Sequence, residues 1–393
     1  MKIAVLFEGN IDNRLGVFNA VVNRAKHLAE AEPGWQVDVY MVQVYDGAVM
    51  RWLRRSRVQA ERPATVEADG VTIHVWWFKR SLLDALGHRV LHRRPRRFIT
   101  WLQSQASLLA DYDLISSHDR VAAQIGAQAA HERGVPHCVT WHGASIYTDP
   151  PRDAMLRNIT IELLRGATCN FFVSRGLEKL ACELAGDIPA EVLYNGASDA
   201  FHRYDDDERA ALRAKYGVHR GHKVVAFIGR HEPVKNVMWL PDIYTRIKEG
   251  YAEGEVTFWS VGDGWQRPQV EQAMKERGVD CRFWGLVPPD EIPAMLNCVD
   301  VLVLPSLLEG LPLVLLEAMQ CGALAVSSDV VGCPEAVGAD NAFDVRDPRF
   351  NERFAARAVQ MLQGRVAQII PATMNWPATA TREAALYRSF SRS

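Results

Sequence analysis

The most informative part of this sequence is Ser306-Leu-Leu-Glu-Gly-Leu-Pro-Leu-Val-Leu-Leu-Glu-Ala-Met-Gln-Cys-Gly322. It follows the apolar segment Val301-Leu-Val-Leu-Pro305, so the pattern indicates a strand, a tight Gly/Pro turn and a helix. The backbone N–H groups at the start of such a helix attract anions such as phosphate. Glu309 and Glu317 stand eight residues apart around the turn, and carboxylates accept hydrogen bonds from hydroxyl groups. A ligand with both phosphate and vicinal hydroxyls is a nucleotide sugar, and the stretch therefore predicts one.

Short apolar runs alternate with helical patterns on both sides of this stretch. The expected strands are 3–7, 37–42, 73–78, 114–117, 138–141, 171–173 and 192–194, then 224–228, 256–261, 281–284, 301–304, 324–327 and 343–345. The expected helices of the first half are 16–31, 98–110, 121–133, 155–166 and 176–185. Continuous apolar strands separated by helices imply parallel sheets that are covered on both faces. We therefore predict two doubly wound, Rossmann-like α/β domains that face a ligand cleft between them.

The length of 393 residues also favours two domains, because one compact core rarely grows so large. The break is expected at 199–222, where Asp205-Asp206-Asp207-Glu208 opens a short polar helix. Metal binding by this acidic run is the alternative to a solvated first turn that complements the helix dipole. We predict an N-terminal acceptor-binding domain at 1–198, a linker at 199–220 and a C-terminal nucleotide-sugar-binding domain at 221–370.

Composition indicates a globular protein, with 48% hydrophobic residues and a net charge of −2. The first eight residues do not resemble a signal peptide, and no segment has the apolar length needed to cross a bilayer. The seven cysteines are scattered without Cys-x-x-Cys pairs. We therefore expect small buried side chains in a reducing cytoplasm, in preference to a disulfide frame or a zinc site.

Two cations are expected at the carboxyl edge of the second sheet. Gly229, Arg230 and Lys235 directly follow the strand 224–228. Ligands of doubly wound sheets bind at this edge, and two cations there could neutralise a diphosphate without a metal. A surface Arg and Lys near a helix start is the alternative interpretation.

Two further loops of the second half end strands in glycine. Gly262 and Gly264 follow the strand 256–261, whereas Gly285 and Leu286 end the strand 281–284, where backbone groups could pair with a base edge. Ordinary turns are the alternative for both loops, since Gly-x-Gly without a third glycine is a weak signal.

The helix start after Glu309 completes the predicted diphosphate site. Gly310, Leu311 and Leu313 offer backbone amides there, and Pro312 lies near the first helical position. Glu317 lies one turn inside the helix and could accept both ribose hydroxyls, whereas Glu309 could accept hydroxyls of the sugar. A charge near a helix N-terminus or a surface residue is the alternative for each glutamate.

These motifs, in this order, resemble the retaining family-four glycosyltransferases, the glycogen-synthase-like and mannosyltransferase-like enzymes of GT-B fold. The resemblance covers Glu309-Gly-Leu-Pro-Leu-Val-Leu-Leu-Glu317, Gly229-Arg230 with Lys235, Val261-Gly-Asp-Gly264, Phe283-x-Gly285, Asp300, Gly332-Cys-Pro-Glu335, Tyr194-Asn-Gly196 and Asn375-Trp376 with Tyr387. It is firm from about residue 190 onward and looser before. It implies that a C-terminal helix, 371–393, returns to the first domain.

The resemblance also implies site residues in the first domain. Val139-Thr-Trp-His-Gly143 places His142 near the anomeric region of the donor, where a structural histidine is the alternative. His118 carries a weaker version of this signal and is expected to be structural. The loop before Gly16 lacks the paired glycines of the family, so only Gly16 is carried over, as a backbone contact near phosphate or acceptor. Lys235 is followed by Asn where the family often has Gly.

The implied reaction is a retaining hexosyl transfer that needs no metal or other cofactor. His142, Glu309, Arg230 and Lys235 are its expected catalytic residues, and the route is a front-face attack without a protein nucleophile. A nucleotide-sugar epimerase and a non-catalytic nucleotide-sugar-binding protein remain the alternatives. The segment Asp111-Tyr-Asp113 spells an Asp-x-Asp metal motif, but its position in a connection favours a plain turn.

The first hundred residues are basic, with 16 Lys and Arg against 10 Asp and Glu. Seven of these cations lie in Lys79–Arg97, where Leu82, Leu83, Leu86 and Val90 recur at helical spacing, and a second cluster with a Trp lies at Arg51–Arg57. Docking on an anionic membrane and a solvated helix with a core-facing stripe are both compatible with this pattern. The expected partners are a nucleotide-sugar donor and a glycan, glycolipid or small-molecule acceptor, but no nucleic acid. The expected location is the cytoplasm, with peripheral attachment to the inner membrane face as an option.

Overall fold

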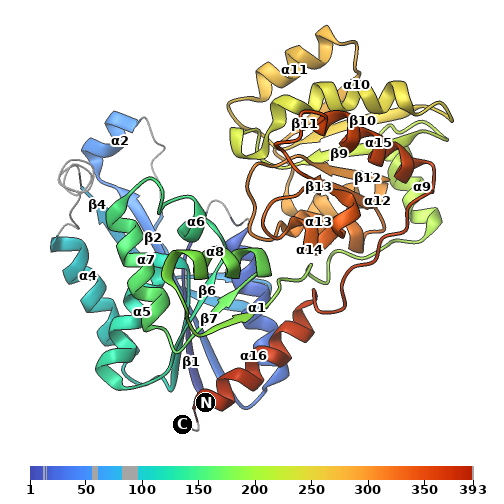
Figure 1. The fold of residues 1–393 in the computed structure, drawn as a ribbon. Helices are drawn as coiled ribbons and strands as arrows, with labels where there is room; N and C mark the ends of the chain where they lie inside the picture. Colours follow the sequence, from blue (N-terminus) through green and yellow to red (C-terminus); the bar gives the residue numbers. More distant parts are fainter. Residues whose placement is uncertain (12–13, 15, 55–60, 82–95, 392–393) are drawn as a thin grey trace. The chain divides into compact units, whose positions relative to one another are not determined.

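The chain forms two compact units in a computed structural model that describes residues 1–11, 14, 16–54, 61–81 and 96–391 (Figure 1). Unit 1 comprises Met1–Asn195 together with Trp376–Ser393, and unit 2 comprises Gly196–Asn375. Each unit is a mainly parallel sheet between helices, which confirms the predicted fold class of two Rossmann-like α/β domains.

Unit 1 contains an eight-stranded sheet in the order β3-β4-β2-β1-β5-β6-β7-β8. Its strands are β1 (Lys2–Glu8), β2 (Gln36–Asp46), β3 (Thr65–Ala68), β4 (Val71–Arg80), β5 (Leu114–His118), β6 (His137–Trp141), β7 (Cys169–Phe172) and β8 (Ala190–Val192). Its helices are α1 (Val17–Ala31), α2 (Ala48–Arg54), α4 (Arg96–Ala106), α5 (Asp119–Arg133), α6 (Ala144–Tyr147), α7 (Ala154–Gly166), α8 (Arg175–Ala185) and α16 (Trp376–Phe390), with a 3-10 turn η1 (Ser107–Leu109). All the pairings are parallel except β3 with β4, and the sequence did not predict β3.

The alternation along β1 explains why helices cover both faces of this sheet. Ile3, Val5 and Phe7 belong to one buried cluster with residues of α1 and α16. Ala4 and Leu6 point to the other face and belong to a second cluster with residues of α4 and α5. Successive side chains of a strand point to opposite faces, so a strand that is apolar at every position must be covered twice.

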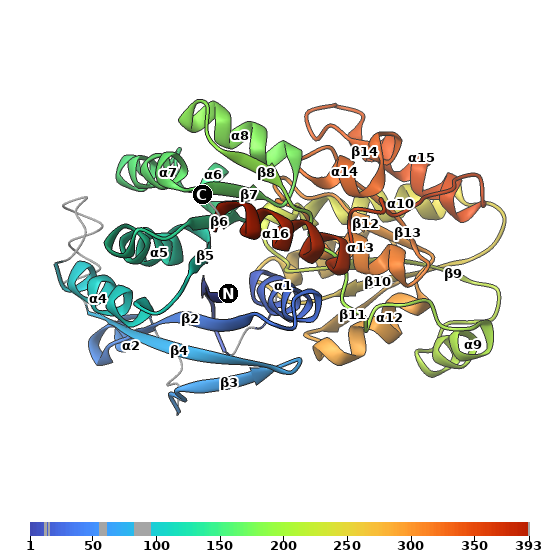
Figure 2. The same ribbon diagram turned by 90° about the horizontal axis from the view of Figure 1, so that it is seen from below.

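The C-terminal helix α16 packs against α1 in unit 1, as Figure 2 shows. Arg24 of α1 donates to Glu383 of α16 at 2.6 Å, and both side chains are buried. The Tyr387 hydroxyl donates to the Glu383 carboxylate, and its oxygen is also hydrogen-bonded to Ser116 Oγ of β5 at 2.8 Å. These buried polar contacts fix α16 on the first unit, where the resemblance had put the C-terminal helix.

Unit 2 contains a six-stranded, fully parallel sheet in the order β11-β10-β9-β12-β13-β14. Its strands are β9 (Lys223–Ile228), β10 (Val256–Val261), β11 (Cys281–Gly285), β12 (Val301–Leu304), β13 (Leu324–Ser328) and β14 (Ala342–Phe343). Its helices are α9 (Asp206–Lys215), α10 (Leu240–Gly250), α11 (Arg267–Glu276), α12 (Ile292–Cys298), α13 (Leu313–Gln320), α14 (Cys333–Val337) and α15 (Phe350–Leu362). Short 3-10 turns are η2 (Pro233–Lys235), η3 (Val237–Trp239), η4 (Pro289–Glu291) and η5 (Ala339–Asn341).

The segment 199–220, expected as a linker, is an integral part of unit 2. Its helix α9 begins with a capping box between Asp205 and Glu208, which explains the acidic run without a metal. Arg213 then bonds to the carbonyl of Cys298 and to Asp300 Oδ2 at 3.0 and 3.2 Å. Polar side chains of α9 therefore tie the segment to the amino end of β12, a contact that helical spacing alone did not predict.

The basic stretch, the membrane-spanning segments and the cysteines were the subjects of three further predictions. Residues 82–95 of the basic stretch, with Leu82, Leu83, Leu86 and Val90, lie outside the described residues, whereas Arg80 pairs with Asp46 at 2.7 Å. Within the described part of the chain, no helix combines the length and the apolar character needed to cross a membrane. All seven cysteines are free thiols; five are buried, whereas Cys182 and Cys281 are partly exposed.

Candidate functional site

Three loops meet at the carboxyl edge of the unit 2 sheet. Backbone hydrogen bonds join them: Gly229 N–H donates to Val261 O at 2.9 Å, Gly262 N–H to Gly285 O at 2.8 Å, and His231 N–H to Asp263 O at 2.9 Å. The loops after β9, β10 and β11 therefore form one connected surface. The sequence had assigned this edge to a diphosphate and a base.

Close packing explains the two glycines after β10. A Cβ atom on Gly262 would lie 2.1 Å from Gly229 O, and one on Gly264 would lie 2.4 Å from His231 O. Gly262 also has a φ of 115°, which side chains rarely allow. Both glycines thus have a structural reason for their presence, in addition to any contact with a ligand.

Lys235 and Glu309 form an ion pair at the same edge. Lys235 Nζ lies 2.5 Å from Glu309 Oε1, and the two side chains are 18% and 11% exposed. The Leu307 N–H donates to Val234 O at 2.8 Å, which holds the loop after β12 against the turn that carries Lys235. The sequence analysis had given the diphosphate to Lys235 and the sugar to Glu309, and the structure brings the two groups into direct contact.

Arg230 is placed differently from Lys235. Its side chain is 60% exposed and pairs with Glu232 at 2.8 Å. Exposed ion pairs of this kind contribute little to stability, roughly 0–1 kcal/mol, and exchange partners easily. Arg230 is therefore available to leave Glu232 for a more highly charged anion.

The turn before α13 differs slightly from its prediction. Pro312 is the residue before the helix, with φ −73° and ψ 113°, and Leu313 is the first helical residue. Gly310 and Leu311 are buried in the turn between Glu309 and Pro312. The first amide groups of α13 thus follow Glu309 closely in space and sequence, and their dipoles favour a negative charge at this end.

Glu317 lies in the second turn of α13 and is half-buried. Burial raises the pKa of its carboxyl from 4.5 to about 7. A low-dielectric surrounding disfavours the charged form of an acid, which explains the direction. Glu317 therefore changes its charge near neutral pH, and its ionised form is the stronger acceptor for the two hydroxyls of a ribose.

Exposed apolar side chains flank the same edge. Leu286, which follows β11, is 78% exposed, and Trp265, in the loop after β10, is 64% exposed. Large apolar side chains at such a position suit the flat face of a base. Leu286 was predicted from the sequence but Trp265 was not, although a Trp directly after Gly-Asp-Gly is a visible signal.

In unit 1, His142 follows β6 and contacts His118 at the end of β5. His118 Nδ1 and His142 Nε2 lie 2.9 Å apart, so one ring must donate to the other. Burial lowers the pKa of His142 to about 3, and the positive charge of Arg24 adds to this effect. The pKa of His118 is also lowered well below its usual range by burial and by the neighbouring ring. His142 is therefore a neutral imidazole at physiological pH.

Asp119 also belongs to this edge of unit 1, and the sequence analysis missed it. Its Oδ1 accepts the backbone N–H of His142 at 3.3 Å, and burial raises its pKa to about 6. Asp119 has a φ of 58°, a conformation that is rare for residues other than Gly and frequent at functional sites. No sequence pattern predicts a left-handed aspartate, so the structure was needed to identify Asp119 as a candidate site residue.

Gly16 lies directly before α1, at the carboxyl side of β1. Its φ is 59°, and no atom lies within 4 Å of the position that a Cβ would occupy. The Ala20 N–H donates to Gly16 O at 3.0 Å, so Gly16 begins the helix. The left-handed conformation alone accounts for a glycine here.

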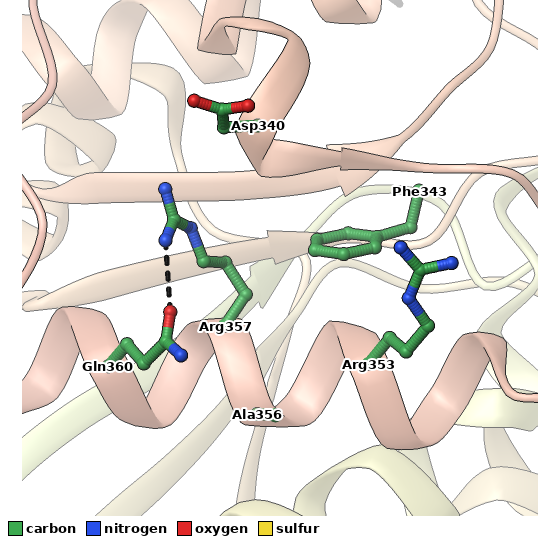
Figure 3. Close-up of a pocket in the computed structure, with 6 residues that line it drawn as sticks. All are labelled: Asp340, Phe343, Arg353, Ala356, Arg357 and Gln360. Carbon is green, nitrogen blue, oxygen red and sulfur yellow. Dashed lines mark hydrogen bonds between the residues drawn. The ribbon is translucent and has the colours of Figure 1, made fainter.

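Within the described residues, neither a metal site nor a surface pocket competes with this site. Across the described ranges, no group of three or more His, Cys, Asp or Glu is arranged to hold a metal ion. Asp113 instead accepts the backbone N–H of Lys2 at 2.7 Å, a structural role. A surface pocket of about 380 Å³ lies over α15, lined by Asp340, Phe343, Arg353, Ala356, Arg357 and Gln360 (Figure 3). None of these six belongs to the predicted site, and both arginines already bond to protein groups.

Comparison with known proteins adds an independent line of evidence. Residues 16–196 match the family model of the glycosyl transferase 4-like domain, and residues 222–364 match that of the glycosyl transferases group 1. The chain is 31% identical over 247 residues to 2-deoxystreptamine glucosyltransferase from Streptomyces kanamyceticus. This alignment covers 58% of this chain and 62% of that protein. It is 28% identical over 232 residues to UDP-Gal:alpha-D-GlcNAc-diphosphoundecaprenol alpha-1,3-galactosyltransferase from Escherichia coli, covering 56% of this chain and 59% of that protein. These alignments thus span less than two thirds of each relative.

The fold has a solved counterpart. The crystal structure of Anabaena HepE in complex with UDP superimposes with a TM-score of 0.69 and 18% identity, covering 100% of this chain and 98% of that one. At this identity the match establishes the arrangement of strands and helices. Two family models that together match most of the sequence, on two Rossmann-like units, show that the chain belongs to the family-four glycosyltransferases of GT-B fold.

Proposed function

We propose that this protein transfers a glycosyl unit from a nucleotide-diphosphate sugar to an acceptor, with retention of the anomeric configuration. The observation that carries the proposal is the Lys235–Glu309 pair, 2.5 Å long and largely buried, at the carboxyl edge of the unit 2 sheet. A cation and an anion held together beside a helix start suit a ligand that has both phosphate oxygens and hydroxyl groups.

The proposed roles follow the charges of this edge. Lys235 and Arg230 stabilise the departing diphosphate, and Glu309 accepts hydroxyls of the donor sugar. Glu317, once ionised, accepts the ribose hydroxyls. Gly229, Gly262, Gly264 and Gly285 let the loops approach one another and the ligand closely, and the amides near Gly310, Leu311 and Leu313 add their dipoles. Leu286 contacts the base.

His142 acts in this proposal as a neutral hydrogen-bond donor to the sugar. Burial holds its pKa at about 3, so it is not an imidazolium that transfers a proton at neutral pH. The proton of the acceptor hydroxyl would pass to the leaving diphosphate oxygen on the front face, without a protein nucleophile. Arginine and lysine would stabilise the charge that develops, so we propose that a hexose is transferred without a metal ion.

We propose that the acceptor of the transferred sugar is a lipid-linked or polysaccharide intermediate in surface-glycan synthesis. The E. coli relative is named for a diphosphoundecaprenol acceptor, and other relatives are named as an O-antigen chain mannosyltransferase and as D-inositol 3-phosphate glycosyltransferases. A glycan acceptor on a membrane lipid fits a cytoplasmic enzyme that docks peripherally on the inner membrane face. The described part of unit 1 supports this docking with Trp52 and Val49, both exposed on α2 next to Arg51. Loss of vesicle binding in Trp52→Ala, measured by flotation with anionic and neutral lipid, would support it, whereas equal binding to both lipids would not.

The donor is tested first by thermal shift with UDP, GDP, ADP and their sugars. A bound donor stabilises the folded protein by mass action and so raises its melting temperature. At a donor concentration a hundred times its Kd, the free energy of unfolding increases by about 2.7 kcal/mol. Incubation with the selected donor and an acceptor series, followed by NMR of the anomeric proton, then separates transfer from epimerisation and from binding alone. Arg230→Ala with Lys235→Ala should lower turnover on the order of 100-fold or more. Arg346→Ala, an exposed arginine of unit 2, is the matched control. Unchanged turnover in the double variant would refute the proposed site.

A further inference from the structure

Asn236 follows Lys235 and adopts an unusual backbone conformation. Its φ is 54° and its ψ is 35°, which is the left-handed region, and it joins the 3-10 turns η2 and η3. The backbone groups are satisfied, because Asn236 N–H donates to Pro233 O at 2.9 Å and Asn236 O accepts from Trp239 N–H at 3.1 Å. Asparagine tolerates this conformation better than most residues, so the turn explains why an asparagine is present. The turn does not explain what its side-chain amide binds.

The side-chain Nδ2 of Asn236 has no hydrogen-bond partner among the described residues. The residue is only 8% exposed, and its Nδ2 is inaccessible and unsatisfied. A buried donor without a partner is costly, and native proteins keep few of them. The Oγ of Ser306, which is fully buried at the end of β12, is unsatisfied as well.

Both unsatisfied groups belong to chain segments that adjoin the Lys235–Glu309 pair. Asn236 is the next residue after Lys235, and the Leu307 N–H contact with Val234 O at 2.8 Å brings the Ser306 loop to the same turn. Two buried polar groups and a buried ion pair therefore share one small region at the carboxyl edge of the sheet. Such a region is built for a ligand with many hydrogen-bond acceptors.

We propose that the Asn236 amide donates a hydrogen bond to a β-phosphate oxygen of the donor, beside the Lys235 ammonium group. This inference rests on the proposed function. Phosphate oxygens only accept hydrogen bonds, and an amide Nδ2 only donates them, so the two groups are complementary. The amide adds no charge, which suits a place where Glu309 already balances Lys235.

Asn236→Gly is the decisive variant, because glycine adopts the left-handed turn without strain and only the amide is lost. We would measure affinities by calorimetry for UDP, GDP and ADP and for the matching monophosphates. A hydrogen bond to a charged group predicts a loss of diphosphate affinity of roughly tenfold to a hundredfold, with monophosphate affinity changed less than about twofold. Asp69→Gly, also left-handed with a φ of 48° but in unit 1, is the control and should change neither affinity.

Asn236→Asp tests the same contact with a side chain of equal size. A carboxylate beside the diphosphate repels it, so this variant should bind nucleoside diphosphates more weakly than Asn236→Gly does. The inference is overturned if Asn236→Gly binds diphosphates as the wild type does, or if it loses monophosphates and diphosphates equally. It is also overturned if Asn236→Asp retains full diphosphate affinity. A wild-type protein that binds no nucleoside diphosphate would instead refute the proposed function itself.

Discussion

Replacing Glu317 by glutamine tests the most unusual carboxylate of unit 2. Burial raises its pKa from 4.5 to about 7 in the folded protein. The folded protein therefore holds this proton more tightly than the unfolded chain, so the associated stability is complete below the unfolded pKa and is lost as the pH rises through about 7. The difference between the two pKa values corresponds to roughly 3 kcal/mol at pH 8.5.

Glutamine resembles the protonated acid and cannot ionise, so Glu317→Gln should remove this loss. We expect the free energy of unfolding of unit 2 to exceed that of the wild type by roughly 3 kcal/mol at pH 8.5, and by less than half of that near pH 5.5. Urea unfolding followed by circular dichroism at both pH values measures this difference, with each transition fitted separately because the chain has two units. Glu249→Gln, which changes an exposed carboxylate of α10, is the control and should have no effect at either pH.

The same substitution has a functional consequence of opposite sign. The ionised carboxylate is the stronger acceptor for the two ribose hydroxyls, so donor affinity of the wild type should increase as the pH rises from 6 to 8. Glu317→Gln should bind the donor more weakly and with no pH dependence over this range. A stability gain that is equal at both pH values, or a wild-type affinity that ignores pH, would refute the assignment of Glu317.

Three other substitutions address separate parts of the structure. Gly262→Ala should destabilise unit 2 by several kcal/mol, because its Cβ would lie 2.1 Å from Gly229 O. Gly278→Ala is the control: its Cβ meets no neighbouring atom, so it should cost only about 1 kcal/mol of left-handed backbone strain. The midpoints of urea unfolding measure the stabilities of both variants. Lys235→Ala should leave Glu309 without its cation and reduce turnover on the order of 100-fold, while far-ultraviolet circular dichroism stays unchanged. Tyr387→Phe removes the hydroxyl that bonds to Ser116 at 2.8 Å and should lower the unfolding free energy of unit 1 by roughly 1–3 kcal/mol; an unchanged melting temperature would contradict it.

Much of the fold could be predicted from the sequence because strands of a doubly wound sheet are apolar on both faces. The run Lys2–Glu8 is an example, since consecutive residues enter two different clusters. The antiparallel strand Thr65–Ala68 was missed because it lies at the sheet edge with alternating partial exposure and carries no long apolar run. The segment 199–220 was misjudged because its attachment depends on arginine contacts with residues about 85 positions away, such as Arg213 with Cys298.

The candidate site could be predicted as a set of residues, but its contacts could not. Glu309 and Lys235 were both singled out, yet their ion pair joins residues 74 positions apart and depends on two loops meeting. Asp119 was missed because its role depends on a left-handed backbone that no residue pattern announces. Trp265 was missed although it follows a glycine-rich loop, because its exposure became known only with the fold.

The division of unit 1 between both ends of the chain has a consequence for biosynthesis. During translation Arg24 emerges 359 residues before its partner Glu383. Unit 2, Gly196–Asn375, is continuous in sequence and can complete its sheet first. Until α16 has been synthesised, Arg24 of unit 1 lacks the carboxylate that balances its charge. The first unit therefore gains α16 only after unit 2 has been synthesised. A stop codon shortly before Trp376 should yield a protein whose second unit is folded and whose first unit is a target for proteases and chaperones.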